Sequence, residues 1–566
     1  MMSDNDGKQE GALRLIEDGN VLEDSGRLDA ALRQYEMAIS MAPGLARAHL
    51  NRGNVLLAKN DGAGAVAAYT TALTHNPGYA AAHFNLGNAY LQLNRSQAAL
   101  ASYDAAILLK PDFVDAEVAR GIALDDIGEL DLAAASARRV LELKPGYTEA
   151  YSNLLFSHNY RLDQPAALLL EDAKNYGQLV KKIAQPFEKW SNDLNPERCL
   201  RVGFVSNDLR NHPVGYFIEA VAAALKRSFS GRLAIYAYPG RCNSDAATAR
   251  IRSCCHSWHP TEGATDEQLA GKIREDKIDI LVDLSGHTAG NRLPMFAWKP
   301  APVQVSWLGY FATTGVEAID YLIADRYTLP AVEEINFTEK IWHLPETRLC
   351  FTPPDDEVDV SPLPASMARG ITFGCFNNLT KMNEDVVTLW SRVLSAIPGS
   401  RLYLKAKQLT ESSVQEKVLN RFAARGIDSA RLRLEGQSSR ADYLKSYQAV
   451  DIALDPFPFP GGTTTVEALW MGVPVLTLPG ERFLSRQGAG LLANVGLPDW
   501  IATGKDDYVA RAIAHAANLE GLALLRGRLR AQVLASPIFD AARFAGHLQE
   551  AFRSMWKKWA GTTPAP

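Results

Sequence analysis

The amino-acid sequence predicts an α + α/β protein, in which an α-helical repeat array precedes two Rossmann-like α/β lobes. Residues recur in a 34-residue register through the first third of the chain. From Leu200 onward, short apolar runs alternate with helical patterns, and a proline-rich stretch near residue 355 divides this part in two. At 566 residues the chain is too long for one core, so about three or four domain-sized units are expected.

The 34-residue period is that of tetratricopeptide helix pairs. In each pair, a glycine allows close contact of the helices, a tyrosine fills the space between them, and a proline follows the second helix. The residues in this register are Gly19, Gly53, Gly87 and Gly121, Tyr35, Tyr69 and Tyr103, and Pro43, Pro77, Pro111 and Pro145. We expect four to five repeats over residues 11–160, because a fifth first helix at 148–160 has Leu155 in place of the glycine.

Stacked helical repeats leave a concave surface that commonly binds peptides. Asn51, Asn85 and Asn153 recur just before the glycine position, at spacings of 34 and 68 residues. Their amides could hydrogen-bond the backbone of a bound peptide, so we predict a peptide groove along them. The alternative is that they are ordinary solvent-facing polar residues.

The remaining domain boundaries follow from changes in the pattern. A helical connection is expected over 161–198, a front lobe over 199–351, a linker over 352–370, a rear lobe over 371–540, and a C-terminal helix and tail over 541–566. The predicted strands are 200–206, 233–238, 278–284, 303–307, 321–323 and 341–344, then 371–376, 401–405, 432–435, 450–454, 474–478 and 500–502. The predicted helices are 215–224, 266–275, 384–396, 410–424, 440–449 and 466–471. Parallel sheets bind ligands at the carboxyl ends of their strands.

Composition narrows the class of partner. A net charge of −5 gives no reason to expect nucleic acid or an anionic membrane surface. The six cysteines show no zinc spacing or disulfide framework, and no apolar run is long enough for a transmembrane helix. The polar residues 1–9 do not read as a signal peptide, so we expect a protein of the reducing cytoplasm.

One loop, at 456–465, has the composition of a phosphate-binding site. It follows the apolar run 450–454 and ends in Gly461, Gly462 and three threonines that open a helix. A helix N-terminus offers unpaired N–H groups and a positive dipole end, which suit a diphosphate. Glu467, about one turn into this helix, could accept hydrogen bonds from a sugar diol. An ordinary helix cap is the alternative.

Other strand ends carry groups that could perform chemistry. Asp208 and His212 follow the first strand of the front lobe and could act as general base and partner, and His287 follows another strand. Lys381 with Asn378 could neutralise a departing phosphate in the rear lobe. Each could instead be a solvated surface residue. No Asp-x-Asp follows a strand facing the expected cleft, so we expect catalysis without a metal or other cofactor.

In this order the motifs resemble the O-linked N-acetylglucosamine transferase family. The motifs are Arg201-Val-Gly-Phe-Val-Ser-Asn-Asp-x-x-x-His212-Pro213, Trp307-Leu-Gly-Tyr310, Asn377-Asn-Leu-Thr-Lys381 and Gly461-Gly-Thr-Thr-Thr465, all after 34-residue repeats. The resemblance implies a GT-B glycosyltransferase that inverts at the anomeric carbon. It further implies transfer of N-acetylglucosamine from UDP-N-acetylglucosamine to Ser/Thr hydroxyls of acceptor proteins.

The resemblance also implies residue roles. His212 matches the active-site histidine proposed as base, Asp208 the alternative proton acceptor, and Lys381 the lysine on the donor diphosphate. Arg440 and Tyr443 match positions around the uracil, and Glu467 matches the ribose-binding carboxylate. The expected donor site comprises Pro213, His287, Gly309, Asn378, Lys381, Ser438, Arg440, Tyr443, Gly461, Gly462, Thr463, Thr464, Thr465 and Glu467.

The chain departs from the animal members at several points. Gly462 stands where they have a histidine, Val214 replaces a threonine, and their large insert between the lobes is absent. The Gly-Gly-Thr-Thr-Thr-Val-Glu sequence is similar to the SPINDLY-type branch, which transfers fucose from GDP-fucose. GDP-fucose or UDP-glucose as donor, asparagine as acceptor, and a repeat scaffold with inactive lobes therefore remain alternatives.

Overall fold

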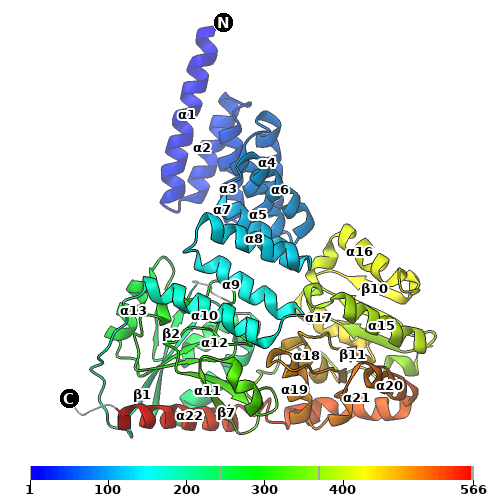
Figure 1. The fold of residues 1–566 in the computed structure, drawn as a ribbon. Helices are drawn as coiled ribbons and strands as arrows, with labels where there is room; N and C mark the ends of the chain where they lie inside the picture. Colours follow the sequence, from blue (N-terminus) through cyan, green and yellow to red (C-terminus); the bar gives the residue numbers. More distant parts are fainter. Residues whose placement is uncertain (1, 241–244, 368–369, 563–566) are drawn as a thin grey trace. The chain divides into compact units, whose positions relative to one another are not determined.

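A computed structural model describes residues 2–240, 245–367 and 370–562 (Figure 1). The chain divides into two compact units, one of residues 1–150 with 406–418 and the other of residues 151–405 with 419–566. Within the described ranges, no helix combines the length and the apolar character needed to cross a membrane.

The first unit is a series of antiparallel helix pairs, coloured blue to cyan in Figure 1. Its helices are α1 (Met2–Asp24), α2 (Leu28–Met41), α3 (Ala46–Ala58), α4 (Gly62–His75), α5 (Ala80–Gln92), α6 (Ser96–Leu109), α7 (Val114–Asp126) and α8 (Leu130–Leu143). A Cβ atom built on Gly53 would lie 2.4 Å from the ring of the fully buried Tyr69. A Cβ atom built on Gly87 would likewise lie 2.4 Å from the ring of Tyr103. The predicted glycine–tyrosine packing is therefore confirmed.

The first unit also contains a segment that the sequence assigned to the rear lobe. Residues 406–418 include η5 (Lys407–Thr410) and the start of α16 (Ser412–Ala423). Polar contacts explain the grouping, since the Lys407 Nζ atom lies 2.9 Å from Asp126 Oδ1. The Glu411 carboxylate accepts from the backbone N–H of Gln97 at 3.1 Å.

The front lobe of the second unit is built on a seven-stranded parallel sheet of order β3-β2-β1-β4-β5-β6-β7. The strands are β1 (Leu200–Ser206), β2 (Leu233–Pro239), β3 (Ser257–Trp258), β4 (Ile280–Asp283), β5 (Val303–Ser306), β6 (Tyr321–Asp325) and β7 (Lys340–Leu344). The helices are α9 (Thr148–Ser157), which begins in the first unit, and α10 (Ala166–Ile183), α11 (Pro213–Phe229), α12 (Ala246–Cys254), α13 (Asp266–Glu275) and α14 (Leu293–Phe296). The short β3, α12 and α14 were not predicted, because each has too few residues to show a period.

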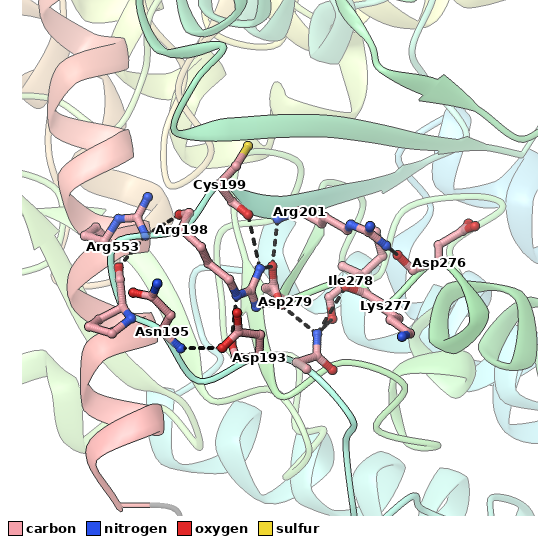
Figure 2. Close-up of polar contacts among 12 residues, drawn as sticks. Asp193, Asn195, Arg198, Cys199, Arg201, Asp276, Lys277, Ile278, Asp279 and Arg553 are labelled. Carbon is pink, nitrogen blue, oxygen red and sulfur yellow. Dashed lines mark hydrogen bonds and ion pairs between the residues drawn. The ribbon is translucent and has the colours of Figure 1, made fainter.

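The expected helical connection is helical only in α10. Beyond Ile183 the chain has no helix before β1, consistent with Pro186 and Pro196 in this stretch. Arg198 holds the segment to the sheet by bonding the carboxylate of Asp279, which precedes β4 and is completely buried (Figure 2). Asn192 donates to the same carboxylate at 2.6 Å. The backbone N–H of Arg201 donates to the same carboxylate at 2.7 Å. The buried charge is thus compensated by a cation and by hydrogen bonds.

The rear lobe has a five-stranded parallel sheet of order β10-β9-β8-β11-β12. The strands are β8 (Thr372–Cys375), β9 (Arg401–Lys405), β10 (Leu432–Glu435), β11 (Ile452–Leu454) and β12 (Val475–Leu476). The helices are α15 (Glu384–Ala396), α17 (Arg440–Ser446), α18 (Thr463–Trp470), α19 (Gln487–Val495), α20 (Lys505–Ala517) and α21 (Leu519–Leu534). The predicted strand 500–502 was wrong, because Ile501 makes only an isolated bridge to Thr477 beside the 3₁₀ turn η9 (Pro498–Trp500).

The last helix, α22 (Ala541–Thr562), returns to the front lobe, where it packs on α11 (Figure 1). Phe544 stacks on Trp307 with ring centroids 5.8 Å apart. The Arg553 guanidinium donates to the backbone carbonyl oxygen of Arg198 at 2.8 Å (Figure 2). It also donates to the carbonyl oxygen of Arg232 at 3.1 Å. The C-terminal helix therefore completes a lobe whose sheet begins more than 300 residues earlier in the chain. Repeats followed by two parallel α/β lobes confirm the predicted fold class.

Candidate active site

A cavity of about 310 Å³ lies in the second unit, bordered by loops that follow β1, β4, β5, β8 and β11. Strand order reverses between β1 and β4 and between β8 and β11, which is where doubly wound sheets bind ligands. The predicted site residues in its wall are Asp208, His212, Pro213, Gly309, Asn378, Lys381, Gly462, Thr463 and Thr464. The structure thus brings nine residues from four separate sequence motifs around one space.

Half of the wall was not predicted. These further residues are Val214, Phe217, Thr288, Leu308, Phe311, Leu349, Asn377, Phe459 and Gln487. Asn377 and Phe459 lie inside motifs that were recognised, and their place in those motifs could have identified them. Gln487 begins α19 and carries no motif of its own, and no local pattern identified it.

His212 occupies the N-cap of α11 and presents its ring at the cavity. Its Nδ1 atom accepts from the backbone N–H of Val214 at 3.3 Å and lies 3.7 Å from Asp208 Oδ2. Burial lowers the pKa of His212, while the charge of Asp208 raises it in part, so the imidazole is neutral near pH 7. Because Nδ1 accepts here, a base function at Nε2 requires the other tautomer, in which the ring proton moves to Nδ1 and faces the Asp208 carboxylate.

Lys381 ends the 3₁₀ turn η4 (Leu379–Lys381), which follows β8. Its Nζ atom donates to Asn377 Oδ1 at 3.1 Å and to the Pro460 carbonyl oxygen at 3.0 Å, and lies 4.1 Å from the centre of the Phe459 ring. Burial lowers the pKa of Lys381 to about 8, against the opposing charge of Asp455. The ammonium is therefore cationic at neutral pH, with few protein oxygens to satisfy it.

The threonine loop forms the start of α18. Val466 N–H donates to the carbonyl oxygen of the N-cap Gly462 at 3.1 Å, so the N–H groups of the preceding turn are those a helix leaves for a ligand. Thr464 Oγ1 donates to Asn377 Oδ1 at 3.0 Å, which links this turn to the Lys381 loop. A Cβ atom on Gly462 would lie 2.6 Å from Gln487 Nε2, so a side chain here would displace Gln487.

Gly461 and Thr465 point away from the cavity wall. Gly461 N–H donates to Asp455 Oδ1 at 2.6 Å, and the buried Thr465 hydroxyl lies 3.5 Å from the same oxygen. The carboxylate of Asp455 thereby organises the loop from within. The expected direct donor contact of Thr465 does not fit this arrangement, whereas a supporting role does.

Three residues expected around the nucleoside form a cluster beside the cavity rather than in its wall. Glu467 is 1% exposed and forms an ion pair with Arg440. The Arg440 guanidinium carbon lies 4.7 Å from the ring centre of Tyr216 and 5.8 Å from that of Tyr443. A ribose could reach the Glu467 carboxylate only if Arg440 moved, so the predicted contact requires an exchange of partners. Ser438 is exposed and donates to the Ser439 carbonyl oxygen.

His287 is separate from the cavity wall. Only 1% of the residue is exposed, and its Nε2–H donates to the Thr314 carbonyl oxygen at 3.0 Å. Nδ1 lies 2.9 Å from Ser152 Oγ, which donates to it. Burial lowers the pKa of His287 to about 4. With both ring nitrogens engaged, the expected donor contact of His287 does not fit this structure.

The asparagines of the predicted peptide groove lie in the first unit, except Asn153. Asn51 Nδ2 donates to Asn20 Oδ1 at 2.7 Å, and Asn85 Nδ2 donates to Asn54 Oδ1 at 2.8 Å. Each bond joins two successive repeats, so these amides serve at least in part to hold repeats in register. Asn153 is half-buried in α9.

The described residues contain no group of three or more His, Cys, Asp or Glu side chains arranged to hold a metal ion. A metal requirement is therefore a question for experiment. Positive charge in the cavity wall comes instead from Lys381 and from the N-terminus of α18.

Comparison with protein families extends over most of the chain. The model of glycosyl transferase family 41 matches residues 158–352 and 363–548. A tetratricopeptide repeat model matches 17–80, 53–112 and 84–148, which confirms the predicted repeats.

Individual proteins give the same result. The chain is 37% identical over 422 residues to a protein of Petunia hybrida, named probable UDP-N-acetylglucosamine–peptide N-acetylglucosaminyltransferase SPINDLY. The match covers 74% of this chain but 45% of that relative, so the chain spans less than half the relative's length. The Arabidopsis thaliana protein of the same name is 36% identical, with 74% and 46% covered.

A solved structure covers nearly all of both chains. A mutant of the O-GlcNAc transferase from Thermobaculum terrenum superposes with a TM-score of 0.84 and 32% identity. The match covers 92% of this chain and 98% of that one. The repeats and the lobes agree with the resemblance found in the sequence. The chain belongs to glycosyl transferase family 41.

Proposed function

We propose that the protein is an inverting, metal-independent glycosyltransferase that moves N-acetylglucosamine from UDP-N-acetylglucosamine to Ser/Thr hydroxyls of proteins. One observation carries this proposal: a cation and a helix N-terminus share one cavity with a neutral histidine and its carboxylate. Lys381 and α18 belong to the rear lobe, whereas His212 and Asp208 belong to the front lobe. A leaving group and an attacking group can therefore be served by residues of different lobes.

The rear wall would bind the donor diphosphate. Lys381, with a pKa of about 8, supplies a positive charge at pH 7 in a partly desolvated position, where charge stabilisation is stronger than in water. Thr463 and Thr464 add hydroxyl and backbone donors at the start of α18. These groups stabilise the negative charge that develops on the diphosphate as the glycosidic bond breaks.

The front wall would receive the acceptor hydroxyl. In a single displacement the hydroxyl oxygen forms a bond to the anomeric carbon while the bond from that carbon to the diphosphate oxygen breaks. The hydroxyl proton passes to His212 Nε2, or to Asp208 in the alternative assignment. Attack opposite to the leaving group inverts the anomeric configuration, and UDP leaves as the second product.

The acceptor would be a segment of a protein, held by the helical repeats. Asn51, Asn85 and Asn153 remain our candidates for its backbone contacts, through amide atoms beyond those that join successive repeats. We expect neither nucleic acid nor a membrane as partner. Free thiols at Cys199, Cys254, Cys255, Cys350 and Cys375 accord with a reducing compartment such as the cytoplasm.

A thermal-shift panel tests the donor and the metal requirement together. UDP and UDP-N-acetylglucosamine should raise Tm equally well with and without EDTA, because binding to the native state alone is stabilising. A larger shift with GDP would move the assignment to the fucose-transferring alternative, which the Gly-Gly-Thr-Thr-Thr-Val-Glu sequence left open. Loss of the UDP shift in EDTA would contradict metal independence.

A substitution tests the role of the lysine directly. Lys381→Ala should lower kcat by about 10²-fold or more, because the charge it supplies is needed most in the transition state. NMR of the product's anomeric proton would separately establish inversion. Near-normal turnover of Lys381→Ala would refute the role given to this residue.

A further inference from the structure

Tyr160 ends the 3₁₀ turn η1 (His158–Tyr160), which directly follows α9. The residue is buried, and its ring centroid lies 5.0 Å from that of Phe459 in a tilted arrangement. Phe156, one turn earlier, supports Tyr160 edge-on at 5.8 Å. The polypeptide that leaves the repeats thus places an aromatic ring against the loop that precedes α18.

Phe459 both contacts Tyr160 and lines the cavity. Its ring lies in the cavity wall, with the Lys381 Nζ atom 4.1 Å from its centre and Phe311 edge-on at 5.5 Å. Lys381 also donates to the carbonyl oxygen of Pro460, the next residue. Two of the three contacts of the Lys381 ammonium are therefore made by Phe459 and Pro460, in the segment on which Tyr160 packs.

The η1 turn is fixed to both lobes. Arg482, in the loop after β12, donates to the carbonyl oxygens of His158, Asn159 and Arg161, at 3.4, 3.4 and 2.6 Å. From the other side, Asn159 Nδ2 donates to the Tyr310 hydroxyl of the front lobe at 3.1 Å. A turn held in this way is a rigid support for whatever packs against it.

We propose that Tyr160 is a positioning residue for the reaction: it holds the Phe459 ring over Lys381, and so sets the place and the hydration of the ammonium that meets the donor diphosphate. The proposal rests on the proposed function, since it assumes that Lys381 contacts a nucleotide diphosphate. Tyr160 itself does not line the described cavity.

Removing the Tyr160 ring would leave one face of Phe459 without a partner. Phe459 could then turn away from Lys381, and water could reach the ammonium. The groups around Lys381 are Asp455 and Cys375 from its own lobe, with His212 and Asp208 across the cavity. None of them is altered by the change, so a shift in the titration of Lys381 would report hydration and position rather than a new charge.

The experiment compares Tyr160→Ala, Tyr160→Leu and Tyr160→Phe with wild type, and uses Tyr151→Ala as a matched control. Tyr151 is an aromatic residue of the preceding helix α9, but it packs on Tyr176 with centroids 6.0 Å apart. The readouts are kcat and KM at saturating acceptor, and the affinity for UDP by calorimetry between pH 6 and 10. The Kd for UDP can be measured without knowing which sugar the protein transfers.

Tyr160→Ala and Tyr160→Leu should lower kcat about 10- to 100-fold, since a displacement of about 1 Å can cost that much. In wild type, UDP affinity should fall as pH rises through about 8, where Lys381 loses its proton. In both variants this fall should move to higher pH, toward the ordinary lysine value of 10.5. Tyr160→Phe keeps the ring and should behave as wild type, as should Tyr151→Ala.

The inference is overturned if UDP affinity in Tyr160→Leu falls at the wild-type pH, or if Tyr151→Ala shows the same loss of kcat. Tyr160→Leu retains most of the buried volume, so it serves even where Tyr160→Ala does not fold. Failure of the proposed function has a different signature, because wild-type protein would then not bind UDP or GDP at any pH.

Discussion

His212 and His287 follow neighbouring parallel strands of one sheet, β1 and β4, yet their surroundings differ completely. The His212 side chain is 34% exposed, caps a helix and lines the cavity. His287 is 1% exposed, with Tyr176 and Tyr310 edge-on at 4.6 and 5.1 Å. Burial lowers the pKa of both, but that of His287 falls to about 4, so this imidazole stays neutral throughout the ordinary pH range.

The difference lies in what covers each strand end. The loop after β4 is covered by α9 and α10, which contribute Ser152 and Tyr176. Among the described residues, the loop after β1 leaves the His212 side chain 34% exposed, in a cavity wall that it shares with Lys381 of the rear lobe. A strand end therefore provides a position for chemistry, and the segments packed over it decide whether it is accessible.

The largest expected effect is a loss of activity, and it distinguishes His212 from His287. His212→Ala should lower kcat by about 10²- to 10⁴-fold, the usual contribution of a general base. UDP affinity should change little, because the diphosphate groups belong to the rear lobe. Steady-state kinetics with calorimetry provide the check, and turnover within a factor of a few of wild type would remove His212 from the mechanism.

The second effect is on stability rather than on chemistry. His287→Leu leaves Ser152 and the Thr314 carbonyl oxygen without their buried partner, and should lower the free energy of unfolding by roughly 2–4 kcal/mol. Activity per folded molecule and UDP affinity should be preserved. A strong loss of UDP affinity in folded His287→Leu would instead return His287 to the donor site.

The pH dependence of stability supplies a control for the same residue. The folded protein binds a proton at His287 only below about 4, whereas the unfolded chain does so below 6.5. The unfolded state thus binds more protons in this window, and stability falls as pH drops from 6.5 to 4, by about 3 kcal/mol from this group. His287→Leu should show a correspondingly smaller slope in chemical denaturation.

A smaller effect distinguishes Asp208 as an orienting group from Asp208 as the proton acceptor. If it orients His212, Asp208→Asn should lower kcat about 10-fold, or about 1.4 kcal/mol. The acidic limb of the kcat/KM profile should move to lower pH, since Asp208 raises the pKa of His212. A loss of 10³-fold or more with disappearance of that limb would assign the proton to Asp208 itself.

The smallest expected effect comes from Ser152, whose hydroxyl donates to the buried His287 ring. Ser152→Ala removes one donor to the ring and should lower the free energy of unfolding by about 1 kcal/mol, with kinetics unchanged. Denaturant midpoints measured at pH 7 are sufficient. A change in kcat for Ser152→Ala would show that packing on the loop after β4 affects the cavity.

Much of the fold and part of the site were predictable from local patterns. The repeat register follows from spacing alone, and its Gly53–Tyr69 contact is the steric consequence. Lys381, His212 and Thr464 were predicted because each follows a buried strand, and parallel strands direct their carboxyl ends to one edge. Thr465 shows the limit of that reasoning, since it is one residue from Thr464 but faces Asp455.

By itself, the sequence determined the order and type of most of the longer elements and the residues able to do chemistry, because periodicity and strand-end position are properties of short segments. Only the tertiary structure decided which of those residues meet. Ser152 hydrogen-bonds His287, which is 135 residues away in the sequence. Arg440 forms an ion pair with Glu467, 27 residues away, and the Tyr160 ring packs on Phe459. Such contacts depend on how distant segments pack, and packing has no local signature.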